Sequence, residues 1–260
     1  MVSFPAQPPI PGYEPIRPLG INLGVVYLAR HSSGVLVALK VWRLEFAGHA
    51  RDLHSPEAQL HHPNIIRVLG MGEFEGNFFC ALEYVERTLA DRLRDGSLSG
   101  VEVARLAHAV GSALQYARDQ GMVPISLSPK SILLTDDNVP KLSGFCASDA
   151  FGRPPNLPPP ALMAPEWVSG ADTASEASQV YCVGALMYEM LTAKTPFAVD
   201  GAVATLMRVL HEMPEPPRKV NRSVGRGLEA VCMKCLAKQP ESRYASLQDL
   251  LDHLKPFEAN

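Results

Sequence analysis

Residues 24–42 read Gly-Val-Val-Tyr-Leu-Ala-Arg-His-Ser-Ser-Gly-Val-Leu-Val-Ala-Leu-Lys-Val-Trp, and this stretch decides how the front of the chain folds. Apolar and β-branched residues fill both of its halves, which is typical of strands. The residues between the halves, His31 to Gly34, suit a tight turn, because the glycine allows a positive φ. The stretch therefore predicts a β-hairpin. Since side chains alternate along a strand, we expect Ala38 and Lys40 on one face of it.

Outward from this hairpin, the chain changes from strand-like to helical segments. Six prolines within residues 1–18 predict an extended lead-in. A second strand pair is expected at Ile65–Leu69 and Phe78–Tyr84, joined through Glu75–Asn77. From about residue 87, apolar residues recur at helical spacing. Helices are predicted within residues 101–117, 180–191, 201–211, 224–237 and 246–254.

This order of elements indicates the fold class. A small β-rich front followed by a larger helical back predicts an α+β protein with two unequal lobes. We expect a proline-rich N-terminal lead-in at residues 1–12, a β-rich N-lobe at residues 13–85 and a helical C-lobe at residues 86–256.

Composition limits the possible partners and location. The chain has 260 residues, with 24 Lys and Arg against 27 Asp and Glu, so its net charge is −3. This balance gives no electrostatic reason to expect that the chain binds nucleic acid or an anionic membrane surface. No apolar run is long enough for a membrane segment, and no signal peptide is visible. Five cysteines are too sparse for a disulfide scaffold, so we expect a cytoplasmic location.

Seven short motifs occur in a fixed order along the chain. They are Leu19–Tyr27 (Leu-Gly-Ile-Asn-Leu-Gly-Val-Val-Tyr), Val37-Ala-Leu-Lys40, His62-Pro-Asn-Ile65, Leu82-Glu-Tyr-Val85, Met163-Ala-Pro-Glu166, Val180-Tyr-Cys-Val-Gly184 and Arg243. Together they resemble the signature set of protein kinases, and are most similar to bacterial serine/threonine kinases of the eukaryotic type. The resemblance covers roughly residues 13–256. It implies a bilobal protein-kinase-like fold.

The resemblance also implies a nucleotide-binding cleft. The residues that match the family's nucleotide contacts are Val26, Ala38, Lys40, Glu83, Val85 and Leu133. In the family, the small apolar members of this set cover the adenine ring, the peptide groups after the fifth strand bind its edge, and the lysine meets the phosphates. Only three residues separate Gly20 from Gly24, one fewer than in the family's glycine-rich loop, so we expect weak phosphate binding.

At the catalytic positions the sequence departs from the family's pattern. Where active kinases carry His-Arg-Asp-Leu-Lys-Pro-x-Asn, residues 124–131 read Pro-Ile-Ser-Leu-Ser-Pro-Lys-Ser without a gap. Ser126 replaces the Asp that accepts the substrate proton, and Ser128 replaces the Lys near the transferred phosphate. Ser131 replaces an Asn that holds Mg²⁺, and Gly144 replaces the Asp of Asp-Phe-Gly. Glycine has no side-chain oxygen for a metal, and serine does not ionise near neutral pH.

These substitutions predict a pseudokinase, which is not an enzyme but a binding, scaffold or regulatory module that partners another protein. Such a module would require no cofactor and would hold ATP or ADP weakly, without Mg²⁺. The alternative is an active, atypical serine/threonine kinase that transfers the γ-phosphate of ATP. Its metal ligands would then come from Asp136, Asp137 or Asp149.

Two further residue pairs have structural interpretations. Glu166 and Arg243 match a buried salt bridge of the family, which implies a structural ion pair. Cys232 and Cys235 have zinc-like spacing, but no second Cys or His pair follows at the distance a zinc finger requires. We therefore predict no metal site and expect both cysteines in the core.

Overall fold

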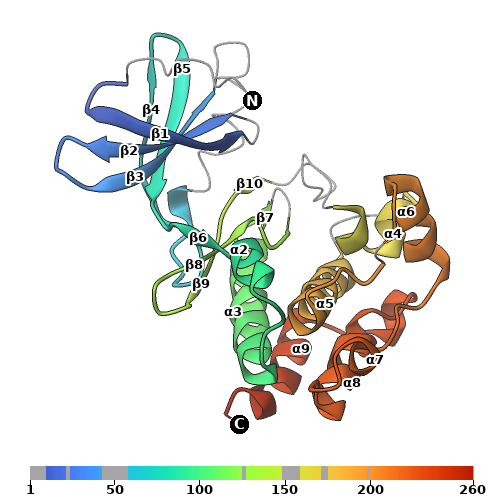
Figure 1. The fold of residues 1–260 in the computed structure, drawn as a ribbon. Coiled ribbons are helices and arrows are strands. Elements are labelled where there is room, and N and C mark those ends of the chain that lie inside the picture. Colours follow the sequence, from blue (N-terminus) through green and yellow to red (C-terminus); the bar gives the residue numbers. More distant parts are fainter. Residues whose placement is uncertain are drawn as a thin grey trace. The chain divides into compact units, whose positions relative to one another are not determined.

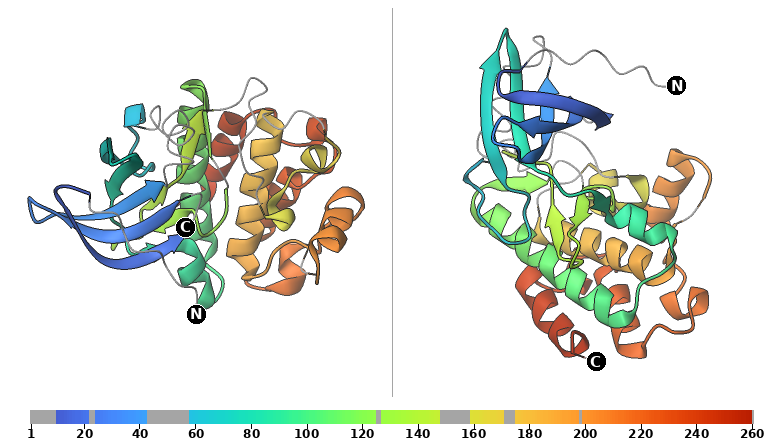
Figure 2. Two further views of the ribbon diagram at one scale, coloured as in Figure 1. Left: turned by 90° about the horizontal axis from the view of Figure 1, so that it is seen from above. Right: turned by 60° about the vertical axis from the view of Figure 1, so that its left-hand side comes forward.

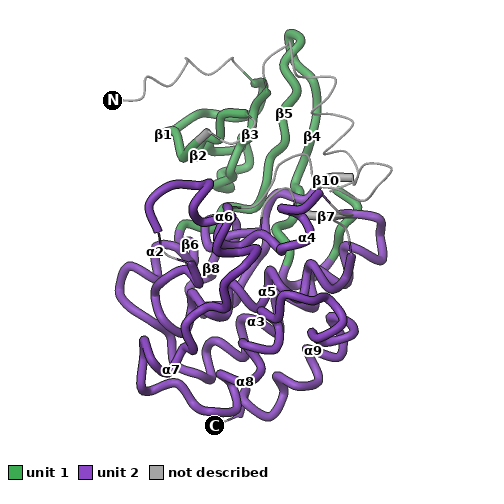
Figure 3. Tube along the Cα trace, turned by 90° about the vertical axis from the view of Figure 1, so that its right-hand side faces the viewer, with its two compact units in different colours: residues 1–61, 65–86 green, residues 62–64, 87–260 purple. Residues whose placement is uncertain are grey.

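The structure is a computed structural model that describes residues 10–21, 24–42, 58–124, 127–147, 159–170, 175–197 and 199–259. The chain divides into two compact units, shown in different colours in Figure 3. Unit 1 consists of residues 1–61 and 65–86, and unit 2 of residues 62–64 and 87–260. The largest sheet lies in unit 1, whereas the described α-helices all lie in unit 2 (Figure 1). The predicted α+β fold class is confirmed.

Unit 1 is built on a five-stranded antiparallel sheet with the order β1-β2-β3-β5-β4. Its strands are β1 (Tyr13–Ile21), β2 (Val25–His31), β3 (Leu36–Trp42), β4 (Val68–Phe74) and β5 (Asn77–Glu83). The predicted hairpin closes at Gly34, which has a φ of 89° and donates its N–H to His31 O at 2.8 Å. The β4–β5 turn has positive φ at both Glu75 and Gly76. Turns of this kind match the right-handed twist of paired strands.

The two edge strands differ from the prediction. β1 runs through Pro15 and Pro18, within the stretch predicted as a lead-in, and its register with β2 shifts next to both prolines. An edge strand tolerates proline because the missing N–H belongs to the side without a partner strand. The strand predicted at Ile65–Leu69 lies later, at Val68–Phe74, because the ladder extends from the turn at residues 75–76 back to Val68 opposite Leu82.

Unit 2 contains two long helices, α3 (Gly100–Asp119) and α5 (Glu176–Thr192), which lie side by side (Figures 1 and 2). α3 begins with a capping box, in which Ser99 and Glu102 each accept a hydrogen bond from the other's backbone N–H. Its buried face runs from Val103 to Ala117, as the apolar periodicity predicts. α5 is buried on nearly all sides, so this helix forms the centre of the core of unit 2.

Shorter elements complete unit 2. They are β6 (Arg87–Thr88), α2 (Leu89–Arg94), β7 (Met122–Pro124), β8 (Ile132–Leu134), β9 (Pro140–Leu142), β10 (Phe145–Ala147), η2 (Pro160–Leu162), α4 (Pro165–Val168), α6 (Ala202–His211), α7 (Pro217–Val220), α8 (Arg226–Cys235), η3 (Pro240–Ser242), α9 (Leu247–Leu254) and η4 (Lys255–Phe257). Strands β6, β8 and β9 form one small sheet, and β7 and β10 form another.

Helices α5 and α8 approach each other very closely at Gly184. A Cβ atom added there would lie 2.3 Å from Cβ of Cys235, so a side chain does not fit. Cys232 and Cys235 are both fully buried, and the Cys232 thiol contacts the Gly184 carbonyl oxygen at 3.5 Å. Both cysteines are therefore packing residues of the α5–α8 interface.

Candidate functional site

The first part of the candidate site is one face of the sheet in unit 1. The β2–β3 register places Val26 opposite Lys40 and Leu28 opposite Ala38. Directly paired residues share a face, and alternate residues of a strand repeat it. The structure thus brings Val26, Ala38 and Lys40 together on one face, whereas Leu39 and Val41 are buried on the other.

Lys40 lies on this face as a buried cation. It is 7% exposed, and its Nζ atom lies 4.7 Å from the centroid of the Trp42 ring. Trp42 is itself buried beside Phe78, with ring centroids 5.2 Å apart. The π face attracts the ammonium group, and more strongly where water is excluded. Sequence reasoning missed Trp42. The sequence contained a signal for it, because Trp42 stands two residues after Lys40 and alternate residues of a strand share a face.

The segment after β5 contains Glu83 and Val85. The Glu83 N–H donates to the carbonyl oxygen of Arg67 at 2.9 Å, and the Arg67 N–H donates to the Glu83 carboxylate at 2.8 Å. A backbone hydrogen bond from Glu83 to an adenine would therefore have to use the carbonyl oxygen. Val85 is half-buried and follows the strand.

Leu133 belongs to unit 2, whereas the other five residues implied for nucleotide binding belong to unit 1. It is the middle residue of β8, where it pairs with Thr88 and Lys141. Its neighbours Ile132 and Leu134 are buried, and Leu133 is half-buried on the opposite face of the strand.

Ser128 and Ser131, two of the residues predicted to stand at substituted catalytic positions, form a closed turn before β8. The Ser131 hydroxyl donates to the Ser128 carbonyl oxygen at 2.9 Å and accepts the Ser128 N–H at 3.0 Å. The N–H and the hydroxyl of Ser143 both donate to the Ser131 carbonyl oxygen, at 2.9 and 3.1 Å. The Ser131 side chain is therefore engaged with the backbone of its own turn. Ser126 lies outside the described residues.

The described residues of this region do not fit a resident Mg²⁺ ion. Mg²⁺ prefers carboxylate and other oxygen ligands in octahedral geometry. Gly144 offers no side-chain ligand, and its φ of 79° is a left-handed conformation that favours glycine. Within the described ranges, no three His, Cys, Asp or Glu residues are placed to hold a metal ion.

The carboxylates named as alternative metal ligands do not change this conclusion. Asp136 and Asp137 are exposed in the β8–β9 turn, which the Thr135 N–H closes by donating to Val139 O at 3.1 Å. The pairing of Ile132 with Leu142 puts this turn at the opposite end of the hairpin from Ser131 and Ser143. Asp149 lies outside the described residues.

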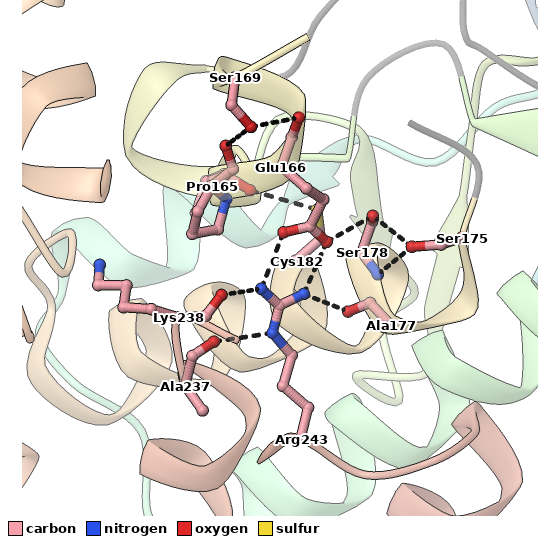
Figure 4. A network of polar contacts seen from close by, with 11 residues as sticks. Pro165, Glu166, Ser169, Ser175, Ala177, Ser178, Cys182, Ala237, Lys238 and Arg243 are labelled. Atoms are coloured by element: carbon pink, nitrogen blue, oxygen red, sulfur yellow. Dashed lines mark hydrogen bonds and ion pairs between the residues drawn. The ribbon is translucent and has the colours of Figure 1, made fainter. Parts of the chain in front are cut away.

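Arg243 is the centre of a fully hydrogen-bonded network (Figure 4). Its two terminal nitrogens donate to the Glu166 carboxylate at 2.7 and 2.8 Å. The remaining N–H groups donate to the carbonyl oxygens of Ala177 at 2.9 Å, Ala237 at 2.8 Å and Lys238 at 3.0 Å. All five donors of the guanidinium thus have acceptors. The Arg243 side chain is 0% exposed and that of Glu166 is 12% exposed.

The neighbours of Glu166 keep its carboxylate ionised. Burial by itself would raise the pKa, but hydrogen bonds from Arg243 and from the Ser178 hydroxyl, at 2.7 Å, outweigh it and lower the pKa. The Tyr181 ring packs against Arg243, with 4.9 Å between the ring centroid and Cζ. Sequence reasoning missed Ser178, and it quoted Tyr181 within a motif without placing it beside Arg243. The sequence contained a signal for both, because residues three apart on a helix, such as these two on α5, lie on the same face.

Residues 13–254 match the family model of the protein kinase domain. The chain is similar to serine/threonine-protein kinase PknJ of Mycobacterium tuberculosis, with 31% identity over 90% of this chain and 43% of PknJ. It is also similar to PknB of Mycobacterium leprae, with 28% identity over 74% of this chain and 33% of PknB. A relative in Clostridium perfringens, named "Probable serine/threonine-protein kinase", is 26% identical over 94% of this chain and 38% of its own length.

The chain therefore spans less than half the length of each of these relatives. Among the described helices, none has the length and apolar character needed to cross a membrane. The comparisons correct the prediction that the chain is not an enzyme, because the relatives that it matches are named as serine/threonine protein kinases. With a match over nearly all of its length, the chain belongs to the protein kinase domain family.

Proposed function

We propose that the chain is an atypical serine/threonine protein kinase domain, which binds ATP on the Lys40 face of unit 1 and transfers the γ-phosphate to a protein hydroxyl. The observation that carries this proposal is the buried Lys40 opposite Val26 and on the same face as Ala38. Two small apolar side chains next to a desolvated cation suit an adenine ring and its phosphates. The names of the relatives support the same reaction class.

In this proposal, the described residues contribute binding and charge. Lys40 would neutralise phosphate charge as a point cation, which is worth more at a buried site than in water. In the transfer, the substrate hydroxyl oxygen forms a bond to the γ-phosphorus, the bond to the ADP oxygen breaks, and the hydroxyl proton passes to water. No step is assigned to a metal ion. Because residue 126 is a serine and not a carboxylate base, we expect a rate about 10²–10⁴ lower than general-base catalysis would provide.

The test measures transfer of radiolabelled phosphate from ATP to the chain itself and to a generic basic protein, with Mg²⁺, with Mn²⁺ and with a chelator. The Lys40→Ala variant removes the cation, and the Lys40→Arg variant keeps a charge there. Lys194→Ala, an exposed lysine of unit 2, is the matched control. We expect slow incorporation that is lost in Lys40→Ala and kept in the control. Equal incorporation in the parent and Lys40→Ala would exclude the proposal.

A second candidate function is nucleotide-dependent protein binding, with ATP or ADP bound weakly and without Mg²⁺. The observation that favours it is the Ser128–Ser131 turn, whose hydroxyl hydrogen-bonds its own backbone. Thermal melting with ATP, ADP and adenosine, each with and without Mg²⁺, distinguishes the two candidates. A ligand at 100 times its Kd stabilises a protein by about 2.7 kcal/mol. Comparable shifts for all three ligands would favour the binding function, whereas a shift for ATP that clearly exceeds the shifts for ADP and adenosine would favour the kinase.

A further inference from the structure

Residues 216–228 contain four cations and no acidic residue, in a chain whose net charge is −3. Arg218 and Lys219 lie on α7, Arg222 lies in the following loop, and Arg226 is the first residue of α8. Arg218 is half-buried, whereas the other three are exposed. Lys219, Arg222 and Arg226 are called the basic patch below.

The patch residues have no carboxylate partner among the described residues of unit 2. Some other exposed cations of this unit are paired, such as Arg87 with Asp95 at 2.6 Å and Lys255 with Asp252 at 2.7 Å. Within the ranges of unit 2 that the structure describes, no carboxylate pairs with a patch residue. The flanking Glu229 is occupied, because it accepts the backbone N–H of Arg218 at 2.7 Å. Within the part of unit 2 that the structure describes, no ion pair therefore neutralises the positive charge of the patch.

The backbone that carries the patch is held in place. The Asn221 side chain donates to the Leu191 carbonyl oxygen at 2.8 Å and to the Ser97 hydroxyl at 3.2 Å. Its carbonyl oxygen accepts the N–H and the hydroxyl of Ser223, at 3.1 and 2.6 Å. Val224, the next residue, is buried, and its N–H donates to the Asn221 backbone carbonyl oxygen at 3.2 Å. Because the loop is already ordered, binding through the patch would cost little backbone entropy.

We infer that the basic patch binds an acidic segment of a protein partner. Charge complementarity carries the inference, since three exposed cations without an ion pair lie within eight residues, on α7, on the loop after it and at the start of α8. Two of the three are arginines, whose planar guanidinium groups bind carboxylates through paired hydrogen bonds.

A membrane partner fits these residues less well. Insertion into a lipid interface needs exposed apolar side chains among the cations. None of the large apolar residues found exposed in the described ranges falls within residues 216–228. The inference is independent of the proposed kinase function, because it uses no residue of the Lys40 face.

The experiment measures fluorescence anisotropy of a labelled oligoglutamate peptide with the full chain, at about 50 mM and about 200 mM salt. The test variant is Lys219→Gln/Arg222→Gln/Arg226→Gln. The matched control is Arg94→Gln/Lys194→Gln/Lys255→Gln, which changes the net charge equally at exposed sites elsewhere in unit 2. We expect the test variant to bind about tenfold more weakly, the control to stay within about twofold, and the parent's affinity to fall at the higher salt.

Two further arms use the same proteins. A phosphoserine-containing version of the peptide should bind at least as well, because phosphate carries more charge than a carboxylate. Vesicles of phosphatidylcholine with phosphatidylserine test the membrane alternative. The inference is overturned if both triple variants weaken binding equally, if the parent binds vesicles but not the peptide, or if it binds no peptide at about 1 mM. Circular dichroism melting of both triple variants verifies that they are folded.

Discussion

The Arg243–Glu166 network and the Ser128–Ser131 turn are two polar regions of unit 2 that satisfy their hydrogen bonds in different ways. In the network, a guanidinium and a carboxylate are both charged, and every guanidinium donor has an acceptor. In the turn, a neutral hydroxyl bonds the backbone three residues away. A stranded buried charge costs several kcal/mol, whereas an unmade neutral hydrogen bond costs about 1–3 kcal/mol.

The two regions therefore differ in how much a mutation is expected to lower the free energy of unfolding. The Glu166–Arg243 ion pair holds two largely buried charges, whereas the hydrogen-bonding groups of the Ser128–Ser131 turn are neutral. Mutations in the network should therefore affect folding strongly, and mutations in the turn should affect it weakly. Three predictions test this contrast.

The largest effect is expected for Arg243→Ala. This change leaves the Glu166 carboxylate, which is 12% exposed, without its charge partner. We expect a loss of about 3–5 kcal/mol in the free energy of unfolding, measured by urea denaturation. The control is Arg94→Ala, which removes an exposed pair with Asp91 at 2.9 Å and should cost below about 1 kcal/mol. Similar losses for the two variants would mean that the network is exposed in solution.

A smaller effect is expected for Ser131→Ala. The change removes the acceptor of the Ser128 N–H, and Ser128 is only 9% exposed. We expect a loss of about 1–2 kcal/mol, because the unpaired group is neutral. Ser32→Ala, in the exposed β2–β3 turn, should stay within about 0.5 kcal/mol of the parent. A loss for Ser131→Ala as large as that for Arg243→Ala would remove the contrast between the two regions.

The smallest effect is a difference in pH dependence. The folded pKa of Glu166 is lowered from 4.5, so its stabilising contribution is complete above that value and is lost as the pH falls through the folded pKa. The parent should therefore lose more stability than Glu166→Gln between about pH 6 and about pH 3. Ser131→Ala should follow the parent in parallel, because serine does not titrate there. Urea denaturation across this range measures all three, and parallel curves for the parent and Glu166→Gln would contradict the prediction.

Much of the fold could be predicted from local pattern. The hairpin at residues 24–42 and helices α3, α5, α6, α8 and α9 follow from alternation, helical periodicity and the turn residues between them. β1 could not be predicted, because Pro15 and Pro18 argue against a strand unless the strand is at an edge. Which strand lies at the edge depends on the order of the whole sheet, and no local stretch of sequence contains that information.

For the candidate site, the sequence by itself determined which residue types stand at the family's positions, including Lys40, Ser131, Gly144, Glu166 and Arg243. The tertiary structure alone decided their partners. The carbonyl oxygens of Ala177, Ala237 and Lys238 complete the Arg243 network, and any residue type could supply them. The contact of Cys235 with Gly184 likewise depends on packing. Backbone acceptors and close contacts of this kind cannot be recognised in the sequence, because they form only where segments that are distant in the chain meet.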